Sequence, residues 1–471
     1  MMNAKNILYL HSHDTGRYIR PYGHAVSTPH LQRFAERGVT FRHAFCANPT
    51  CSPSRACLLT GQYAHINGMM GLAHRGGRLN DPSRTLPALL RDHGYDTVLA
   101  GFQHIADLST GDSMQRYGYS HEPHLDRAPA LDHETRDEAT VDAAVKFLGS
   151  RRHDQTPFFL DAGFFATHRT SPPPSAEPKV GADAWHNGVH SPIGDPRYVL
   201  PPACLPDTPT TRKDFADFAE AATRLDRYYG QVLDELERAG LAHDTLVLIT
   251  TDHGLAFPRM KCNLTAHGIG VAMMMAGPGA PNGQAFTGGR VIEGLVSHVD
   301  WFPTVCGVLN IQPPDGVQGQ SMLPLLEASQ DDAPGREAVF AEVNYHAAYE
   351  PMRSVRTHDF SYIRRLQDVD HAVYPNIDDS VTKRQAEESG FLNQKPAQEM
   401  LFDLRHDPAE LCNCIDQPAY GDIADSMRAR LDRWMKETHD PALQDLPRAA
   451  GIKMNSIDDF SPTCPTTLES S

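Results

Sequence analysis

The sequence predicts an α/β fold: a large, mostly parallel mixed sheet flanked by helices, followed by a smaller C-terminal α+β domain with an antiparallel sheet. Through residue 309, short continuous apolar runs alternate with helical segments, a pattern typical of parallel strands covered on both faces. A stretch rich in Pro, Gly and Asp at 312–336 separates this region from shorter alternating segments and one late helix. We therefore expect domains at 1–335 and 336–455, followed by a poorly ordered tail at 456–471.

The individual elements follow from local periodicity and end signals. Strands are expected where short apolar runs stop at polar residues, and helices where apolar residues recur at helical spacing. In the first helix, Thr28 occupies the N-cap, Pro29 the first turn and Gly38 the stop position. A Pro-rich excursion at 169–211 is expected on the surface, either as a substrate lid or as a plain loop. The expected elements are a strand at 6–10, a helix at 27–38, a helix and then a strand within 85–101, a helix at 138–150, a strand at 157–164, a helix at 212–240, strands at 244–254 and 271–277, and a helix within 296–309.

Composition and charge argue against several classes of protein. The formal net charge of −16 over 471 residues disfavours a broad nucleic-acid interface, which requires basic excess, but permits a small anionic substrate. No stretch reaches the roughly 18 apolar residues of a membrane span. The first residues, MMNAKNILYLHSHD, lack the long apolar run of a secretory signal, so we expect a cytoplasmic protein. Nine cysteines, an odd number without an export signal, argue against a disulfide framework.

Polar residues follow four of the expected strands. They are HSHD at 11–14, GFQH at 101–104, ATH at 166–168 and TDHG at 251–254. Ligands of mostly parallel sheets bind beyond the carboxyl ends of the strands. We therefore expect these four segments to converge on one edge of the sheet.

The segment NPTCSPSRACLLTG at 48–61 combines a thiol, a helix-starting proline and an arginine. Pro53 fits the first turn of a helix, so Cys51 is expected just before a helix N-terminus, where free N–H groups attract anions. Arg55 lies four residues on and on the same side. A lowered thiol pKa is expected in such a place. Local reasoning leaves three alternatives open: a reactive cysteine, an anion-binding helix, and a buried cysteine before an ordinary helix.

A longer set of motifs carries a resemblance to a known family. CSPSR, followed by LLTG and HINGMMG, resembles the signature of the type I sulfatases of the alkaline phosphatase superfamily. NILYLHSHDTG, TPHLQRFAERGVTFRHAF, TTDHG, VDWFPTV and LFDLRHDPAELCN resemble further family segments in the same order, so the likeness covers nearly the whole chain. CSPSRACLLTGQYAHINGMMGL and HGLAFPRMKCNL are most similar to the heparan N-sulfatase, or sulfamidase, group. The resemblance implies an alkaline phosphatase-like fold, and oxidation of Cys51 to formylglycine by a formylglycine-generating or anaerobic maturation enzyme.

The resemblance also implies one divalent metal ion, which is calcium by likeness to the family. The family commonly has Asp where this chain has His13, and often Asn where it has His253. Two imidazoles would shift the metal preference from calcium toward manganese or zinc. The implied metal ligands are His13, Asp14, Cys51, Asp252 and His253.

Catalytic roles are implied in the same way. Residue 51 would supply the nucleophile, with Arg55 holding it and His104 close by. His168 would be the acid for the leaving group, and Lys261 would bind sulfate. The family lysine that precedes the histidine of GFQH is absent, which leaves one sulfate-binding cation missing unless Arg75 or another residue replaces it. The implied catalytic residues are therefore Cys51, Arg55, His104, His168 and Lys261.

The sequence thus predicts a sulfatase that hydrolyses a sulfate ester or a sulfamate, of a sugar among other candidates, through a formylglycine diol and a metal ion. The alternative is a phosphonate monoester or phosphodiester hydrolase of the same superfamily, which uses the same aldehyde. A non-catalytic binding protein is disfavoured because Cys51 and Arg55 are both retained, and a plain cysteine hydrolase is disfavoured by the metal-ligand pattern. The expected partners are a small sulfated substrate and the maturation enzyme, with no nucleic acid and no membrane. Whether the chain forms a homo-oligomer is left open.

Overall fold

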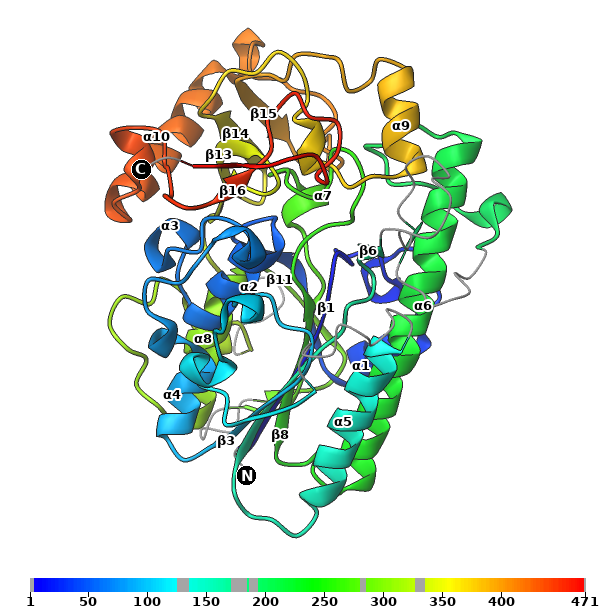
Figure 1. Ribbon diagram of the computed structural model, residues 1–471, viewed down its shortest axis with the longest axis vertical. Helices are drawn as coiled ribbons and strands as arrows, with labels where there is room; N and C mark the ends of the chain where they lie inside the picture. The colour runs from blue at the N-terminus through cyan, green and yellow to red at the C-terminus, as the bar shows by residue number, and fades with distance from the viewer. Residues whose placement is uncertain are drawn as a thin grey trace.

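The computed structural model describes residues 4–124, 135–170, 184–185, 194–279, 285–326 and 335–469. A large α/β part lies below a smaller part built on an antiparallel sheet in Figure 1, as the sequence predicts. The domain boundaries at 335 and 455 stay predictions. Much of the expected excursion at 169–211 lies outside the described residues, as does 327–334 of the expected linker.

The large sheet is mixed and mostly parallel. Its strands follow the order β11-β2-β9-β8-β1-β5-β3-β4, and β10 pairs with β9. Along this path, within the described residues, β9 alone runs antiparallel to its neighbours. The strands are β1 (Asn6–Ser12), β2 (Val39–Phe45), β3 (Asp96–Gly101), β4 (His121–His124), β5 (Phe158–Gly163), β8 (Thr245–Thr251), β9 (Met273–Pro278), β10 (Ala285–Phe286) and β11 (Arg290–Ser297).

The central strand β1 shows why its sequence is a continuous apolar run. Successive side chains of a strand point to opposite faces of the sheet. Ile7 and Tyr9 pack into the apolar core on one face, and Leu8 and Leu10 into the core on the other. All seven residues of β1 are buried, because helices cover both faces.

Two groups of helices form these covers. Figure 1 shows α1, α5 and α6 along one side of the sheet, and α2, α4 and α8 along the other. The long helix α6 presents Leu225, Tyr229 and Val232 to the core that holds Leu8 and Leu10. The helices of this part are α1 (Pro29–Arg37), α2 (Cys51–Thr60), α3 (Ala64–Asn67), α4 (Leu86–Asp92), α5 (Arg136–Ser150), α6 (Pro209–Arg238), α7 (Ala266–Ile269) and α8 (Trp301–Leu309). Among the described residues, none of the helices combines the length and apolar character needed to cross a membrane.

The smaller part has an antiparallel sheet in the order β12-β13-β14-β15, which confirms the predicted α+β character. Helix α10 packs Leu431 and Trp434 against this sheet, in a core that also includes Cys57 and Tyr63 of the α/β part. The two parts therefore share buried apolar surface. The remaining elements are β6 (Arg169–Thr170), β7 (Ala184–Trp185), β12 (Val339–Tyr345), β13 (Tyr349–Arg356), β14 (Phe360–Arg365), α9 (Val381–Glu388), β15 (Glu399–Asp403) and α10 (Gly421–Glu437).

The last described residues are held in place, which corrects the expectation of a poorly ordered tail. β16 (Lys453–Met454) pairs with β17 (Thr467–Leu468). Between these strands, the Pro462 carbonyl oxygen accepts a hydrogen bond from Arg75 Nη2 (2.8 Å), and the Phe460 carbonyl oxygen accepts one from Lys383 Nζ (2.6 Å). The sequence expectation failed because these bonds join residues far apart in the chain. The guanidinium group of Arg75 therefore binds the C-terminal segment between β16 and β17.

Candidate active site

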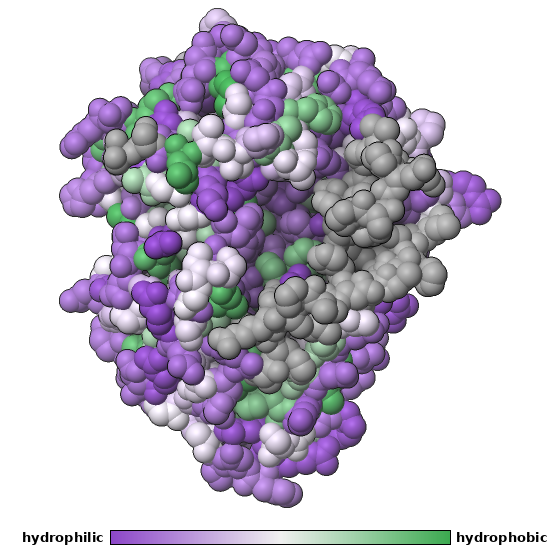
Figure 2. All heavy atoms as spheres, viewed as in Figure 1, coloured by the Kyte–Doolittle hydropathy of each residue, from purple (hydrophilic) through white to green (hydrophobic). Residues whose placement is uncertain are grey.

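The predicted site residues meet at the carboxyl edge of the large sheet. His13 and Asp14 follow β1, and Asp252 and His253 follow β8, which pairs with β1 in parallel so that Ser12 lies opposite Thr251. The Asp14 backbone N–H donates to Asp252 Oδ1 across this junction (2.8 Å). Figure 2 shows a hollow in this region, between the smaller part and the strands of the large sheet.

Cys51 is the first residue of α2, one position later in the helix than the sequence suggests. Its side chain is buried, and Sγ lies 3.4 Å from His253 Nε2. Burial raises the Cys51 pKa well above its ordinary value, and Asp14 and Asp252 raise it further against the opposing effect of Lys261. The expected lowering of the thiol pKa is therefore wrong, because a helix N-terminus is outweighed by burial beside two carboxylates.

The donor atoms around Cys51 fit a divalent cation. Ligand atoms of Asp14, Cys51, Asp252 and His253 all lie within 4.8 Å of one another, as do those of His13, Asp14, Cys51 and His168. His13 Nε2 and Asp14 Oδ1 are buried without a hydrogen-bond partner among the described residues, and His13 Nδ1 lies 2.9 Å from Asp252 Oδ2. Buried polar atoms of this kind normally bind a proton donor, water or an ion. Carboxylate and imidazole donors in one cluster suit a divalent metal.

The backbone at Asp14 is shaped to bring this carboxylate into the cluster. Asp14 has a φ of 50°, in the left-handed region that Asp tolerates better than most residues. Burial opposes ionisation of its carboxyl group, but the neighbouring positive groups, Lys261 first among them, together outweigh this effect, and the Asp14 pKa lies well below its ordinary value. His168 and His253 act in the same direction. Asp14 is therefore an anion at neutral pH.

Two cations face the two carboxylates. Arg55 Nη2 donates to Asp252 Oδ2 (3.0 Å), and Lys261 Nζ donates to Asp14 Oδ2 (3.0 Å). Arg55 is 4% exposed and Lys261 is 2% exposed. Because water is excluded, these pairs interact more strongly than surface ion pairs.

The two remaining candidates, His104 and His168, line the same cluster. The His13 ring lies 5.0 Å from the His168 ring and 6.1 Å from the His104 ring, between centroids. His104 Nε2 is 2.9 Å from His74 Nδ1. Burial lowers the pKa of both candidates, to about 4 for His168 and well below the ordinary range for His104. All nine predicted site residues therefore come together in one place.

Sequence reasoning missed two residues of the smaller part that reach the cluster. Asp378 Oδ1 accepts a hydrogen bond from Lys261 Nζ (3.3 Å). Burial opposes ionisation of Asp378, but Lys261 together with His168 and His346 outweighs this effect, and the Asp378 pKa lies at about 2. His346 is 7% exposed, and its pKa is lowered by burial and then by Lys261. Neither residue lies in a local pattern that signals a site, because each reaches the cluster only through packing between the two parts.

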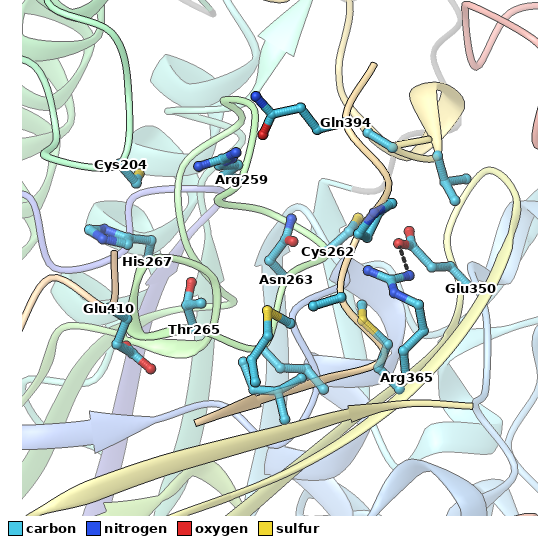
Figure 3. Close-up of a pocket in the computed structure, with 18 of the residues that line it drawn as sticks. Cys204, Arg259, Cys262, Asn263, Thr265, His267, Glu350, Arg365, Gln394 and Glu410 are labelled. Carbon is cyan, nitrogen blue, oxygen red and sulfur yellow. Dashed lines mark hydrogen bonds and ion pairs between the residues drawn. The ribbon is translucent and has the colours of Figure 1, made fainter. Parts of the chain in front are cut away.

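A separate cavity of about 380 Å³ is lined by Cys262 and Asn263, the two residues that follow Lys261. Figure 3 shows Cys262 within it, together with the ion pair of Glu350 and Arg365. No candidate catalytic or metal-binding residue lines this cavity. It is therefore distinct from the cluster around Cys51.

Comparison with known proteins gives the family. Residues 5–311 match the family model named Sulfatase. The chain belongs to the sulfatase family. The N-sulphoglucosamine sulphohydrolase of Homo sapiens is 31% identical over 477 residues, which cover 93% of this chain and 91% of that protein. This sulfatase is therefore a sulfuric ester hydrolase, and the predicted resemblance to the sulfamidase group is confirmed.

Solved structures confirm the fold of this sulfatase. A protein in complex with its substrate D-glucosamine-2-N,6-O-disulfate has a TM-score of 0.67 and 18% identity, with 94% of this chain and 100% of that chain covered. The phosphonate monoester hydrolase of Silicibacter pomeroyi also has a TM-score of 0.67, with 19% identity and coverage of 93% and 97%. At this level of identity, the two structures show a shared fold alone.

Proposed function

We propose that this sulfatase hydrolyses the sulfate ester or sulfamate of a sugar at the cluster around residue 51. The observation that carries the proposal is the convergence of Asp14, Asp252, Arg55 and Lys261 on Cys51 at one sheet edge. The similarity to an N-sulphoglucosamine sulphohydrolase over 93% of the chain supports a sulfated amino sugar as the substrate. The structural neighbour that binds a disulfated glucosamine agrees with this substrate class.

Residue 51 requires a modification for this chemistry. We propose that a formylglycine-generating or anaerobic maturation enzyme oxidises Cys51 to an aldehyde, which hydrates to a diol. One hydroxyl attacks sulfur as the sugar oxygen or nitrogen leaves, and the second then loses its proton, which re-forms the aldehyde and expels sulfate. An unmodified thiol is a poor nucleophile here, because burial and the two carboxylates raise the Cys51 pKa.

Asp14, Asp252, His253 and residue 51 would hold the metal ion, with His13 as a further ligand. When bound, the ion would supply positive charge that polarises sulfate oxygens and favours loss of a proton from the nucleophile. The unpartnered Asp14 Oδ1 and His13 Nε2 are the atoms that the ion would satisfy. Two imidazoles in the set favour manganese or zinc over calcium.

The protein's own cations would then stabilise the charge that spreads over the sulfate oxygens. Lys261 Nζ has three N–H groups and gives two of them to Asp14 and Asp378, so one remains for a substrate oxygen. Arg55 Nε has no hydrogen-bond partner among the described residues, so it too offers a donor. Pre-oriented donors of this kind contribute most when they are shielded from water, and both side chains are buried.

His168 would donate a proton to the leaving group. Its Nδ1 donates to the Arg169 carbonyl oxygen, so the lone pair is on Nε2, which lies 4.0 Å from Asp14 Oδ2. With its pKa lowered to about 4, the ring is neutral at pH 7. An anionic sulfate beside it favours the imidazolium form, which can then protonate the departing oxygen or nitrogen.

Two measurements on one preparation test the proposal. Mass spectrometry of the tryptic peptide 43–55, from protein made in its native host, reads residue 51 beside Cys46, which serves as an internal unmodified control. Turnover of N-sulfoglucosamine, an aryl sulfate and an aryl phosphonate is then compared. We expect an aldehyde at residue 51 only, and sulfate release that exceeds phosphonate cleavage. Active protein with an intact thiol at residue 51 would refute the mechanism, and faster phosphonate cleavage would favour the alternative hydrolase.

A further inference from the structure

A buried chain of hydrogen bonds leads from Arg55 to three residues that are not in the metal cluster. Arg55 Nη1 bonds to His11 Nδ1, His11 Nε2 lies 2.7 Å from Asp161 Oδ1, and the Tyr119 hydroxyl donates to Asp161 Oδ2. His11 is 3% exposed, Asp161 2% and Tyr119 1%. We propose that His11, Asp161 and Tyr119 are positioning residues that fix the orientation of Arg55 for the reaction. This inference rests on the proposed function of Arg55.

The donor and acceptor roles in this chain follow from the chemistry of its ends. An arginine side chain can only donate hydrogen bonds, so His11 Nδ1 must be the acceptor and carry no proton. The neutral ring then has its proton on Nε2, which donates to the Asp161 carboxylate. Tyr119 can only donate to the second oxygen of that carboxylate. One arrangement of protons therefore satisfies every member, and Asp161 selects the histidine tautomer that Arg55 requires.

The two strands are built to hold the imidazole in this place. β1 pairs in parallel with β5, with His11 opposite Gly163 and Tyr9 opposite Asp161, so Asp161 reaches His11 diagonally. A Cβ atom at residue 163 would lie 2.5 Å from His11 Cε1, so only glycine leaves room for the ring. Tyr9 stacks on the other side, with 4.5 Å between ring centroids. The imidazole therefore has little freedom to turn.

The fixed His11 ring in turn restricts the orientation of the guanidinium group of Arg55. Its Nη2 donates to the Ser12 carbonyl oxygen and to Asp252 Oδ2, both at 3.0 Å, while Nη1 donates to His11. These three bonds involve both terminal nitrogens, Nη1 and Nη2, and fix the plane of the guanidinium group. Nε has no partner among the described residues and remains for the substrate. A misplacement of about 1 Å in a catalytic group can cost roughly 100-fold in rate.

A double-mutant cycle with Arg55 separates positioning from mere stabilisation. In otherwise wild-type protein we expect Arg55→Lys and His11→Leu each to lower kcat by about 100-fold, with a smaller change in KM. In the His11→Leu background, Arg55→Lys should cost less than about 3-fold more, because the arginine is already misplaced. Losses that multiply in the double variant would overturn the proposal.

Matched variants control for stability. His65 Nδ1 lies 2.8 Å from Glu342 Oε1 in an equally buried histidine–carboxylate pair, so His65→Leu should lower the unfolding midpoint as His11→Leu does while kcat stays within about 3-fold of wild type. If His65→Leu lowers kcat as much as His11→Leu, the effect is structural and the proposal fails.

A gentler pair of variants covers the case in which His11→Leu does not fold. Tyr119→Phe removes one hydrogen bond to Asp161 and should lower kcat by about 2- to 10-fold. Tyr117→Phe removes a similar bond, from its hydroxyl to Asp112 Oδ2 (2.8 Å), and should leave kcat unchanged. Equal kcat values for the two variants would count against the proposal.

A spectroscopic readout does not depend on turnover. In protein labelled with ¹⁵N-histidine, two-dimensional NMR at neutral pH should show a neutral His11 with its proton on Nε2, assigned by the loss of its signals in His11→Leu protein. A proton on Nδ1 would refute the hydrogen-bond chain directly. If the tautomer is as expected but no sulfated substrate is turned over, the proposed function fails and the hydrogen-bond chain stands.

Discussion

We predict that replacing Lys261 by methionine destabilises the metal-free protein and that a divalent cation reverses much of the loss. Lys261 Nζ donates to Asp14 Oδ2 at 3.0 Å and to Asp378 Oδ1 at 3.3 Å. Burial acts to lower its pKa, but the two carboxylates outweigh burial and raise the Lys261 pKa well above its ordinary value. Methionine keeps the length of the side chain and removes the charge, so both carboxylates lose their cation.

The size of the effect follows from these contacts. Removing one partner of a buried ion pair costs about 3–5 kcal/mol, because the remaining charge stays buried without compensation. At roughly 2 °C per kcal/mol for a large domain, the unfolding midpoint of Lys261→Met should fall by about 6–10 °C. A cation bound at Asp14 replaces the lost positive charge. Metal should therefore raise the midpoint of the variant more than that of the wild type.

Thermal unfolding in a chelator and in excess Mn²⁺ measures both quantities. Lys383→Met is the matched control, because Lys383 is also fully buried and its bonds go to Asp379 and to the carbonyl oxygens of Ile377 and Phe460. The control should lose comparable stability and gain no extra response to metal. An equal metal response in Lys261→Met and Lys383→Met would refute the electrostatic reasoning.

Three further predictions concern the nucleophile, the metal and a remote ion pair. Cys51→Ala should abolish sulfate release with a loss of only about 1 kcal/mol in unfolding free energy, and turnover above roughly one thousandth of wild type would contradict the assigned nucleophile. His13→Asp should make Ca²⁺ raise the unfolding midpoint more, and Mn²⁺ less, than in wild type, because calcium prefers oxygen ligands; unchanged responses would place residue 13 outside the metal site. Burial acts to lower the His65 pKa, but Glu342 outweighs it and the pKa is raised. A histidine whose pKa is higher in the folded protein than in the unfolded chain stabilises the fold at pH values below its unfolded-state pKa. This contribution is lost as the pH rises through its folded-state pKa. His65→Gln should therefore cost about 1.5–3 kcal/mol near pH 6 and less near pH 9, and a loss that does not change with pH would contradict the ion pair.

The main features of the fold and of the metal cluster could be predicted because they follow from short-range rules. Buried parallel strands are continuous apolar runs, and their carboxyl ends meet at one edge. His13 with Asp14 and Asp252 with His253 follow neighbouring strands, so their proximity needed only the strand assignment. A helix beginning close to Cys51 followed from Pro53 in the same way, although Cys51 is the first residue of α2 and was expected just before it.

The features that sequence reasoning missed depend on packing between distant segments. The Cys51 pKa is set by burial and by carboxylates from two other strand ends, which a local helix argument does not include. Asp378 comes from the smaller part and lies beside Lys261 only in the folded chain. Asp161 did leave a signal, since it is a charged residue inside an otherwise apolar strand, whereas His11 lies beside Ser12 at the polar end of β1. A buried strand rarely contains such a residue unless a neighbouring strand supplies its partner.

The charges around the site have a common arrangement. Arg55 bonds to Asp252 in the cluster and is linked through His11 to Asp161 outside the cluster. In the same way, Lys261 bonds to Asp14 in the cluster and to Asp378 outside it.

Each cation thus lies between an inner carboxylate that would bind metal and an outer one that would not. Four carboxylates against two cations leave two negative charges, which one divalent ion neutralises. When that ion draws charge from the inner carboxylates, the outer carboxylates still hold the cations in place. Fixed cations need no reorganisation as charge develops on sulfate, and this is the condition under which electrostatic stabilisation contributes most to catalysis.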